Sequence, residues 1–303
     1  MGTSKNYLAY IYLICATALW GGSIIAAKIA SIIMLEPIKL SFYRNLVVIF
    51  ILLPFVFNKL ITNKAIYIKN WKLITLLSVL SVSIFNTFLN IALTTTSVIS
   101  SSLMPAFTPA LIILLSFLIY NSTITVFQSI GAVVSFFGFI TIVLRGSLIN
   151  LSQFDFVTGD LWMLSAVVCW AIYSVLLKKI PKNFDSIVFL FLIFFIGNLI
   201  VIPFYILESS IYNTFLLNEK YGWSIVLFVG IGPALISYLF WIKSVKIIGA
   251  GKSGLFLNLI PIFSGFISII FLREILEIYH IIGAILIFTG IYLVTKENHN
   301  EKN

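Results

Sequence analysis

The sequence consists mainly of long apolar segments separated by short polar ones. The segments fall roughly at residues 7–33, 40–57, 73–94, 97–119, 124–144, 160–178, 186–207, 223–245, 250–272 and 276–295. About 20 apolar residues allow an α-helix to cross the roughly 30 Å hydrocarbon core of a bilayer, and a helix satisfies its own backbone hydrogen bonds there. We therefore predict an all-α integral membrane protein with ten transmembrane helices, surrounded by the lipid bilayer.

Composition excludes a soluble protein. Only 10% of the 303 residues are charged and 61% are hydrophobic, with a mean hydropathy of +1.13, whereas soluble domains carry about 25% charged residues. The two cysteines, Cys15 and Cys169, lie inside apolar segments without CxxC spacing or a nearby histidine cluster. We therefore expect no metal site, no disulfide and no cofactor.

The net charge of +9 is explained by membrane topology rather than by nucleic-acid binding. With a cytoplasmic N-terminus, thirteen of the nineteen basic residues fall in cytoplasmic segments: Lys5, Lys59, Lys64, Lys69, Lys72, Lys178, Lys179, Lys182, Lys243, Lys246, Lys252, Lys296 and Lys302. Four fall in outer segments: Lys39, Arg145, Lys220 and Arg273. Because Lys and Arg concentrate in cytoplasmic loops, we predict that both termini are cytoplasmic. We also expect a location in the plasma (inner) membrane and no nucleic-acid partner.

The chain contains an internal repeat. ATALWGGSIIAAK at 16–28 matches AVVCWAIYSVLLK at 166–178, so that Trp20 recurs as Trp170. IGAVVSFFGFI at 130–140 matches IGAILIFTGIY at 282–292, and Pro109 recurs as Pro261. The repeat predicts two halves, 1–150 and 155–303, with five helices each. An odd number of helices per copy inverts the second copy in the membrane, which is a construction common among secondary transporters.

The repeated segments resemble the EamA family of the drug/metabolite transporter superfamily, once per half and over essentially the whole chain. The residues that carry the resemblance are Trp20-Gly21-Gly22 with Lys28, Pro37 with Arg44, Ser101-Ser102 with Pro105 and Pro109, Gly131 with Gly138, Gly159-Asp160 with Trp170, Pro261, and Arg273-Glu274. Each motif is weak alone, and their order and doubling make the resemblance specific. The sequence departs from the family at one turn, where Glu274 supplies an acid in the second half and Asn121 stands in the first.

The resemblance implies a carrier with a central cavity between the two halves. The first, third, fourth, sixth, eighth and ninth helices would line this cavity. The expected substrate is a small molecule of amino-acid-like, amine, nucleotide-linked or drug-like character. The family does not select among these classes.

Few side chains could bind and release a proton inside the predicted helices. None of the ten Asp and Glu residues lies near the middle of a predicted helix, and His280 and His299 lie near a helix end and in the tail. A proton-coupled carrier commonly uses a buried carboxylate, so a facilitator or exchanger is at least as well supported as a proton symporter. No acid–base pair, Ser–His pair or metal cluster suits catalysis, and we therefore expect no enzymatic activity.

The candidate substrate-binding residues are polar or aromatic side chains on the predicted cavity helices: Trp20, Lys28, Asn86, Asn90, Ser101, Ser102, Trp170, Tyr173, Tyr238, Trp241 and Asn258. Each type has an alternative role. Lys28 either pairs with an anionic substrate or extends to the interface. Amides and hydroxyls either bind substrate or join helices, and aromatic rings either stack on substrate or mark the interface. Trp20 and Trp170 are deeper than an interfacial position requires.

Pro105, Pro109, Pro233 and Pro261 are candidate gating hinges, because proline removes a helical hydrogen bond. The alternative for each is a static kink.

We predict a transporter of small metabolites that works by alternating access. The competing interpretation is a multi-span membrane protein with an enzymatic, structural or signalling role. The sequence does not specify the substrate, the direction, the coupling ion or the oligomeric state.

Overall fold

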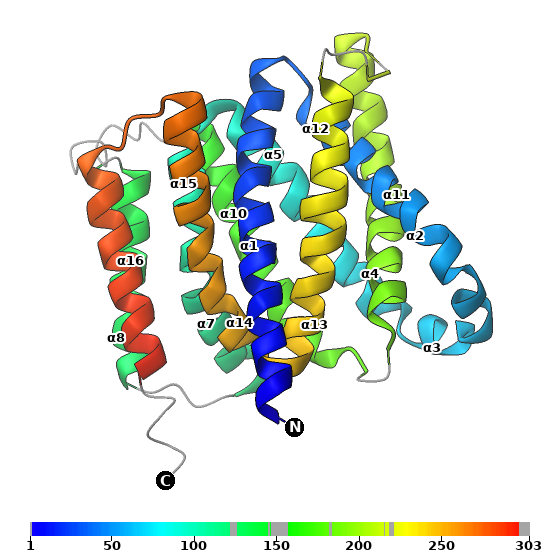
Figure 1. The fold of residues 1–303 in the computed structure, drawn as a ribbon, viewed down its shortest axis with the longest axis horizontal. Helices are drawn as coiled ribbons and strands as arrows, with labels where there is room; N and C mark the ends of the chain where they lie inside the picture. Colours follow the sequence, from blue (N-terminus) through cyan, green and yellow to red (C-terminus); the bar gives the residue numbers. More distant parts are fainter. Residues whose placement is uncertain are drawn as a thin grey trace.

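The computed structural model describes residues 2–121, 126–144, 146, 157–181, 184–214, 216–217 and 221–296. These residues form helices and their connections and no strand, which confirms the predicted all-α class. Figure 1 shows the helices standing side by side, with the start of α1 and the end of α16 at the same end of the bundle. Arg145, Lys182 and Lys220, which the topology prediction places in loops, lie outside the described residues.

In the first half of the chain, two of the rods are built from more than one helical segment. The elements are α1 (Gly2–Ile32), α2 (Pro37–Thr62), α3 (Lys64–Lys69), α4 (Trp71–Ser78), the π-helix η1 (Val79–Ile84), α5 (Phe85–Thr95), α6 (Val98–Leu103), the 3-10 helix η2 (Met104–Phe107), α7 (Thr108–Tyr120) and α8 (Val126–Val143). One rod runs through α4, η1 and α5, and another runs through α6, η2 and α7.

The second half repeats this order. Its elements are α10 (Thr158–Leu176), the 3-10 helix η3 (Leu177–Lys179), α11 (Ser186–Tyr212), α12 (Gly222–Val229), the π-helix η4 (Gly230–Ser237), α13 (Tyr238–Ile248), α14 (Ala250–Leu255), the 3-10 helix η5 (Phe256–Asn258), α15 (Leu259–Leu272) and α16 (Ile278–Lys296). The rod α12–η4–α13 corresponds to α4–η1–α5, and α14–η5–α15 corresponds to α6–η2–α7.

Seven of the ten predicted segments coincide with helices that are long and apolar enough to cross a membrane. Among the described residues these are Asn6–Ile32, Pro37–Thr62, Trp71–Thr95, Val98–Tyr120, Thr158–Lys179, Ser186–Tyr212 and Gly222–Ile248. Shorter apolar helices, Ser129–Gly138, Phe256–Leu272 and Ile278–Gly290, fall in the other three segments. The number of ten crossings therefore stays a prediction.

The irregular helical turns recur in both halves. The π-helices start at Val79 and Gly230, an offset of 151 residues, and the 3-10 turns start at Met104 and Phe256, an offset of 152. These offsets match the shift found in the sequence repeat. Because π-helical turns are rare and concentrate at functional sites, their occurrence at equivalent positions directs attention to the rods that carry them.

The glycine pairs of the sequence repeat join the two halves. α8 and α16 pack together along their length, and a Cβ at Gly138 would lie 2.7 Å from the carbonyl oxygen of Gly283. Gly131 and Gly290 make the reciprocal contact. The position in one helix rises as the position in the other falls, so the helices run antiparallel. Repeat-equivalent helices thus meet in the orientation that an inverted second half requires.

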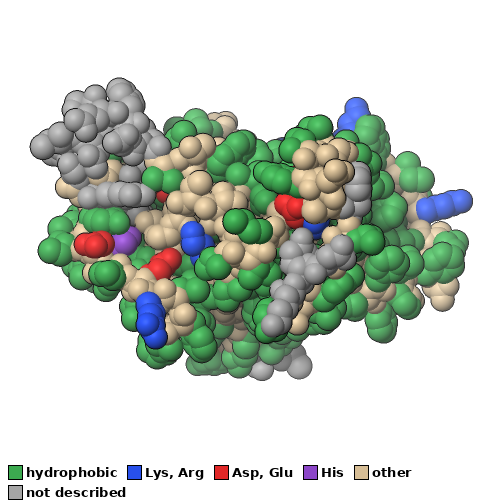
Figure 2. Space-filling model, turned by 90° about the horizontal axis from the view of Figure 1, so that it is seen from above, with side chains coloured by type: hydrophobic (Ala, Val, Ile, Leu, Met, Phe, Trp, Pro, Cys, Tyr) green, Lys and Arg blue, Asp and Glu red, His purple; other side chains and the backbone are tan. Residues whose placement is uncertain are grey.

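The outside of the bundle is apolar. Large hydrophobic side chains such as Phe55, Phe266 and Phe271 are 69–73% exposed. Figure 2 looks along the helices onto the end where α1 finishes, and hydrophobic side chains surround its perimeter with few charged ones among them. Polar groups lie inside instead, as where Asn45 of α2 donates to Asn198 of α11 over 3.2 Å. This distribution is inverted relative to a soluble protein and suits a lipid environment.

Candidate substrate-binding cavity

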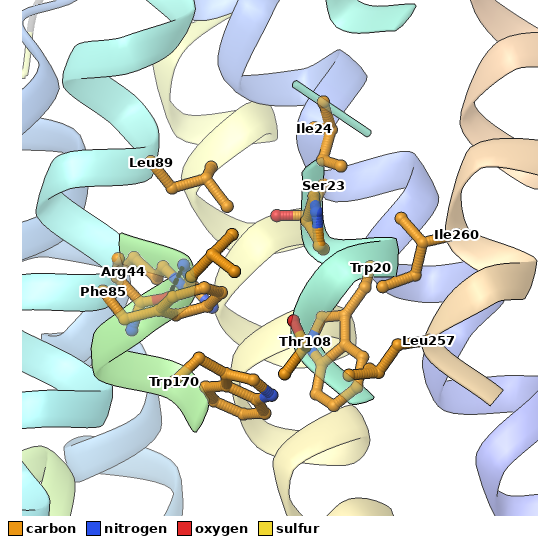
Figure 3. A pocket seen from close by; sticks show the side chains of 13 residues that line it. Trp20, Ser23, Ile24, Arg44, Phe85, Leu89, Thr108, Trp170, Leu257 and Ile260 are labelled. Atoms are coloured by element: carbon orange, nitrogen blue, oxygen red, sulfur yellow. Dashed lines mark hydrogen bonds between the residues drawn. The ribbon is translucent and has the colours of Figure 1, made fainter. Parts of the chain in front are cut away.

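A cavity lies in the middle of the bundle between the two halves. The residues that line it come from α1, α2, α5, α7, α10, α15 and the 3-10 turns η2 and η5: Trp20, Ser23, Ile24, Arg44, Phe85, Asn86, Leu89, Pro105, Thr108, Val167, Trp170, Leu257 and Ile260. Figure 3 shows their side chains gathered around one space. Both halves contribute, so any relative movement of the halves changes the shape of this cavity.

Aromatic rings form one wall of the cavity. The ring centroids of Trp20 and Trp170 are 5.5 Å apart and the rings are nearly perpendicular, at 82°. The two repeat-equivalent tryptophans therefore meet in direct edge-to-face contact. Tyr238 and Trp241 lie within 6.1 Å of both indoles and are fully buried, which places them behind this wall. Close packing of this kind fixes the orientation of the two indoles.

The irregular turn of α12–η4–α13 holds Trp20 in place. The indole Nε1 of Trp20 donates to the carbonyl oxygen of Pro233 over 3.1 Å. Beside it, a Cβ at Gly21 would lie 2.9 Å from Cβ of Phe263, so the glycine is what lets α15 approach α1 this closely. The WGG motif is thus explained by geometry, because the tryptophan faces the cavity and the following glycine permits helix contact.

A polar group beside the indoles consists of Arg44, Asn86 and Tyr238. Nη1 of Arg44 donates to Oδ1 of Asn86 over 2.8 Å, and Nδ2 of Asn86 donates to Oη of Tyr238 over 3.1 Å. The carbonyl oxygen of Ser81, inside the π-helix η1, accepts from Asn86 and from Tyr238 over 3.1 and 2.6 Å. The two π-helical rods are therefore connected by hydrogen bonds directly beside the cavity.

The cavity is narrow in this conformation. The space open to the centre of a water molecule is about 40 Å³, and one water needs about 10–15 Å³ by this measure. A few waters fit, whereas a metabolite requires the surrounding helices to move apart.

The structure brings only some of the sequence candidates to this cavity. Trp20, Trp170, Asn86 and Pro105 line it, while Tyr173, Tyr238 and Trp241 are buried nearby. The remaining candidates lie elsewhere in the bundle: Lys28, Asn90, Ser101, Ser102 and Asn258, with the prolines Pro109, Pro233 and Pro261. Sequence reasoning named no role in the cavity for Arg44, Ser23, Thr108 or Phe85. The available signal for Arg44 was a basic residue inside the apolar run 40–57.

Several of these other candidates connect helices. Nδ2 of Asn90 donates to Oγ of Ser41 over 2.9 Å, which joins α5 to α2. Ser102 donates to the carbonyl of Ile99 within its own helix. Ser101 and Asn258 are buried, and their side-chain oxygens Oγ and Oδ1 have no hydrogen-bond partner. The prolines lie in or next to irregular turns. Pro105 is the second residue of η2, Pro233 lies inside η4, and Pro109 and Pro261 lie in the first turn of the helices that follow the 3-10 turns.

Polar contacts cluster at the end of the bundle where α1 finishes. Nζ of Lys28 donates to the carbonyl oxygens of Leu93 and Thr96, over 3.1 and 3.0 Å, at the end of α5. Thr96 Oγ1 in turn donates to Oδ1 of Asp160 over 3.0 Å. The bond between Thr96 and Asp160 connects the first and second halves, and both bonds of Lys28 are to backbone carbonyls of the first half.

Two carboxylates at the same end hold helix N-termini. Oε1 and Oε2 of Glu274 accept from the backbone N–H groups of Val98 and Ile99, over 2.8 and 3.0 Å, at the start of α6. Glu208 accepts in the same way from Ile38 and Lys39 at the start of α2, over 3.1 and 2.7 Å. A helix N-terminus has unpaired N–H groups and a partial positive charge, which a carboxylate neutralises. Each contact links repeat-equivalent rods.

A duplicated helical chain with an apolar exterior and a cavity lined from both halves has the architecture of a secondary membrane transporter. The sequence model of the EamA-like transporter family matches residues 7–144 and again residues 157–296. The chain therefore belongs to the EamA-like transporter family, and it is a multi-pass membrane transporter. The predicted resemblance is confirmed.

Relatives agree with this assignment. The chain is 27% identical over 224 residues to the uncharacterized transporter YyaM of Bacillus subtilis strain 168, covering 74% of this chain and 72% of that protein. It is 26% identical over 294 residues to an uncharacterized transporter of Archaeoglobus fulgidus, covering 97% and 99%. A crystal structure covers 100% of both chains with a TM-score of 0.65 and 16% identity, which shows a shared fold.

Proposed function

We propose that this protein moves small metabolites across the membrane by alternating access through the central cavity. The observation that carries the proposal is the pairing of Trp20 and Trp170, which are equivalent in the two repeats and meet in the cavity wall. Exchange of conformation between two inverted halves opens such a cavity to one side and then to the other. The small volume of the cavity fits a closed intermediate of this cycle.

The proposal includes ten membrane crossings, with five per half and both termini on the cytoplasmic side of the plasma membrane. The ends of the described chain support a shared side, since α1 begins and α16 ends at one end of the bundle (Figure 1). The irregular turns that contain Pro105 and Pro233 would act as hinges, because a helix bends most readily where its hydrogen-bond ladder is interrupted.

The direct test is transport by the purified protein. A library of amino acids, amines, nucleosides and aromatic acids is first screened by thermal shift in detergent, and each stabilising compound is then tested for uptake into proteoliposomes. We expect at least one stabilising compound to enter proteoliposomes faster than protein-free liposomes. If compounds bind but none crosses the membrane, the transport proposal is wrong.

The same vesicles test energy coupling. No Asp, Glu or His lines the described cavity, and Glu208 and Glu274 accept hydrogen bonds from backbone N–H groups. Transport should therefore persist when a protonophore collapses the pH gradient at a clamped membrane potential. Loss of uptake under these conditions would require a proton relay and would contradict the facilitator or exchanger mechanism.

A further inference from the structure

The guanidinium of Arg44 lies at the middle of the bundle, where a charge is expensive. The residue is 3% exposed and lines the central cavity with Asn86. Figure 3 shows Arg44 beside Phe85 and Trp170. Its Nη1 donates to a neutral amide oxygen, that of Asn86, over 2.8 Å. Its Nε is buried without any hydrogen-bond partner. A buried ionised group normally has both a counter-charge and a full set of hydrogen bonds.

No carboxylate supplies that counter-charge. Among the described residues, no Asp or Glu oxygen lies within ion-pair distance of the guanidinium, whereas Lys39 and Lys59 pair with Glu36 and Asp185, each over 2.7 Å. A buried charge without its partner is strongly destabilising, because the cost of removing it from water is not compensated. Arg44 is therefore a buried cation without a counter-charge, and a bound anion would supply both the counter-charge and the missing hydrogen-bond acceptor.

A second unpaired group lies in the same cavity. Thr108 is fully buried at the start of α7, lines the cavity, and its Oγ1 has no hydrogen-bond partner. Figure 3 shows Thr108 facing the same space as Arg44. Buried hydroxyls almost always have partners, so two partnerless polar groups in one cavity indicate a ligand that satisfies both. A hydroxyl can donate to the same anion that a guanidinium binds, or bind a neighbouring polar group of the ligand.

The rest of the cavity wall defines the remainder of the ligand. Trp20, Trp170, Phe85, Leu89 and Leu257 present apolar or aromatic surface around the polar group. Such surface binds a planar or branched hydrocarbon body by burial and edge-to-face contact. The site thus combines a single positive charge with an apolar chamber.

We propose that Arg44 binds the carboxylate of the transported solute, and that the substrates are small organic monoanions with an aromatic or branched apolar body. This inference rests on the proposed transport function and names its substrate class. A planar guanidinium matches a carboxylate with two parallel hydrogen bonds. A phosphate dianion carries a second charge, and the described cavity lining holds only one cation, so the carboxylate is the better match.

The test compares carboxylates with amides of the same shape. The probes are benzoate and benzamide, phenylacetate and phenylacetamide, and indole-3-acetate and indole-3-acetamide, with phenyl phosphate as the dianionic alternative. Dissociation constants come from thermal-shift titrations of the full-length protein in detergent. We expect at least one carboxylate to bind wild type at least ten-fold more tightly than its amide and more tightly than phenyl phosphate.

Three variants assign this preference to a residue. Arg44→Gln should reduce the carboxylate preference to less than two-fold, and Arg44→Lys should restore part of it, because an ammonium keeps the charge without the planar pair of donors. Asn86→Asp tests the same idea with Arg44 intact. It places a permanent carboxylate 2.8 Å from the guanidinium and should remove the preference. Lys59→Gln, which removes an exposed cation from the same helix, is the matched control and should keep it.

Two results would overturn the proposal. The first is a wild-type protein that binds every amide as tightly as its carboxylate. The second is a preference that survives in both Arg44→Gln and Asn86→Asp and is lost in Lys28→Gln, which would assign the counter-charge to Lys28 instead. In the first case, uptake of a neutral or cationic solute into proteoliposomes would still support transport through this cavity, so the two proposals fail separately.

Discussion

Charged groups at one end of the bundle and in its centre differ in how fully they are hydrogen-bonded. At the end where α1 finishes, Glu208 and Glu274 each accept hydrogen bonds from two backbone N–H groups. In the central cavity, Arg44 has one neutral acceptor and an Nε without a partner. A charge whose hydrogen bonds are all provided by the fold stabilises the fold, whereas a charge with unused donors is available to a ligand. On the proposal above, this difference distinguishes the carboxylates that stabilise the fold from the cation that binds substrate.

The largest expected effect, on both stability and binding, is that of truncating Trp170 in the aromatic wall of the cavity. The ring of Trp170 contacts those of Trp20, Tyr238, Trp241 and Phe85. Trp170→Ala should lower the free energy of unfolding by about 3–5 kcal/mol, as for other buried aromatic truncations, and weaken binding by about 1–3 kcal/mol. Thermal unfolding and ligand titration in detergent measure the two effects. A loss of binding without loss of stability would show that the wall is not part of the packed core.

Next in size is the effect of removing an end carboxylate. Glu208→Ala leaves two N–H groups at the start of α2 without acceptors, and a buried unsatisfied group costs about 1–3 kcal/mol. We expect the midpoint of thermal unfolding to fall by several degrees, while the carboxylate preference of the remaining folded protein is unchanged. Glu208→Gln, which keeps one acceptor oxygen, should lie between wild type and alanine. If Glu208→Ala changes the carboxylate preference as much as Arg44→Gln, the distinction between the two regions fails.

A smaller effect on stability is expected for the cavity cation itself. Replacing a buried charge that has no counter-charge by an apolar side chain of similar length is often neutral or stabilising. Arg44→Met should therefore change the free energy of unfolding by less than about 1 kcal/mol and still abolish the carboxylate preference. Chemical or thermal unfolding measures the first quantity, with Glu208→Ala as the reference. A loss of stability as large as that of Glu208→Ala would assign Arg44 a structural role.

The smallest effect is expected at the opposite end, where Asp185 precedes α11 and pairs with Lys59. Burial alone would raise the pKa of the Asp185 carboxyl, but hydrogen bonds from Lys59 and from the N–H groups of Ile187 and Val188 outweigh it and hold the pKa below its ordinary value. The stabilisation is present above the pKa of the unfolded chain, about 4, and is lost as the pH falls through the lower pKa of the folded state.

Asp185→Asn should therefore lower the unfolding midpoint slightly at neutral pH, and the difference from wild type should shrink as the pH falls below about 4. The pair is partly exposed, so added salt should reduce the difference as well. Thermal unfolding as a function of pH and salt measures both. A difference from wild type that grows as the pH falls would have the wrong sign.

The sequence predicted the parts of the molecule that depend on local pattern. Apolar length predicted the helices, and the repeat marked Trp20 and Trp170 as equivalent positions on the predicted cavity helices. Their direct ring contact depends on how the two halves pack together. The π-helical turns were not predictable, because they depend on contacts between residues far apart, such as Tyr238 with the carbonyl of Ser81. Arg44 was missed for a similar reason. Whether a basic residue in an apolar helix has a partner is decided by its neighbours from other helices.

Lys28 is a second basic residue whose partners could not be predicted from the sequence. Its depth in the first segment made it the natural candidate for a counter-charge, and the sequence alone left interface contact as the alternative. In the structure its Nζ donates to the carbonyl oxygens of Leu93 and Thr96, which are acceptors that no sequence pattern indicates. Its role toward substrate stays a prediction, and the variant Lys28→Gln decides it.

The central claim is that one cavity opens alternately to the two sides of the membrane. Ser23 lines that cavity on α1. In a protein whose native Cys15 and Cys169 are replaced by alanine, Ser23→Cys is exposed to a membrane-impermeant thiol reagent in right-side-out and in inside-out vesicles. Asn63→Cys, in the exposed connection after α2, is the control for sidedness. The account predicts that Ser23→Cys is labelled from both sides and Asn63→Cys from the cytoplasmic side alone. Labelling of Ser23→Cys from only one side, or from neither, would contradict it.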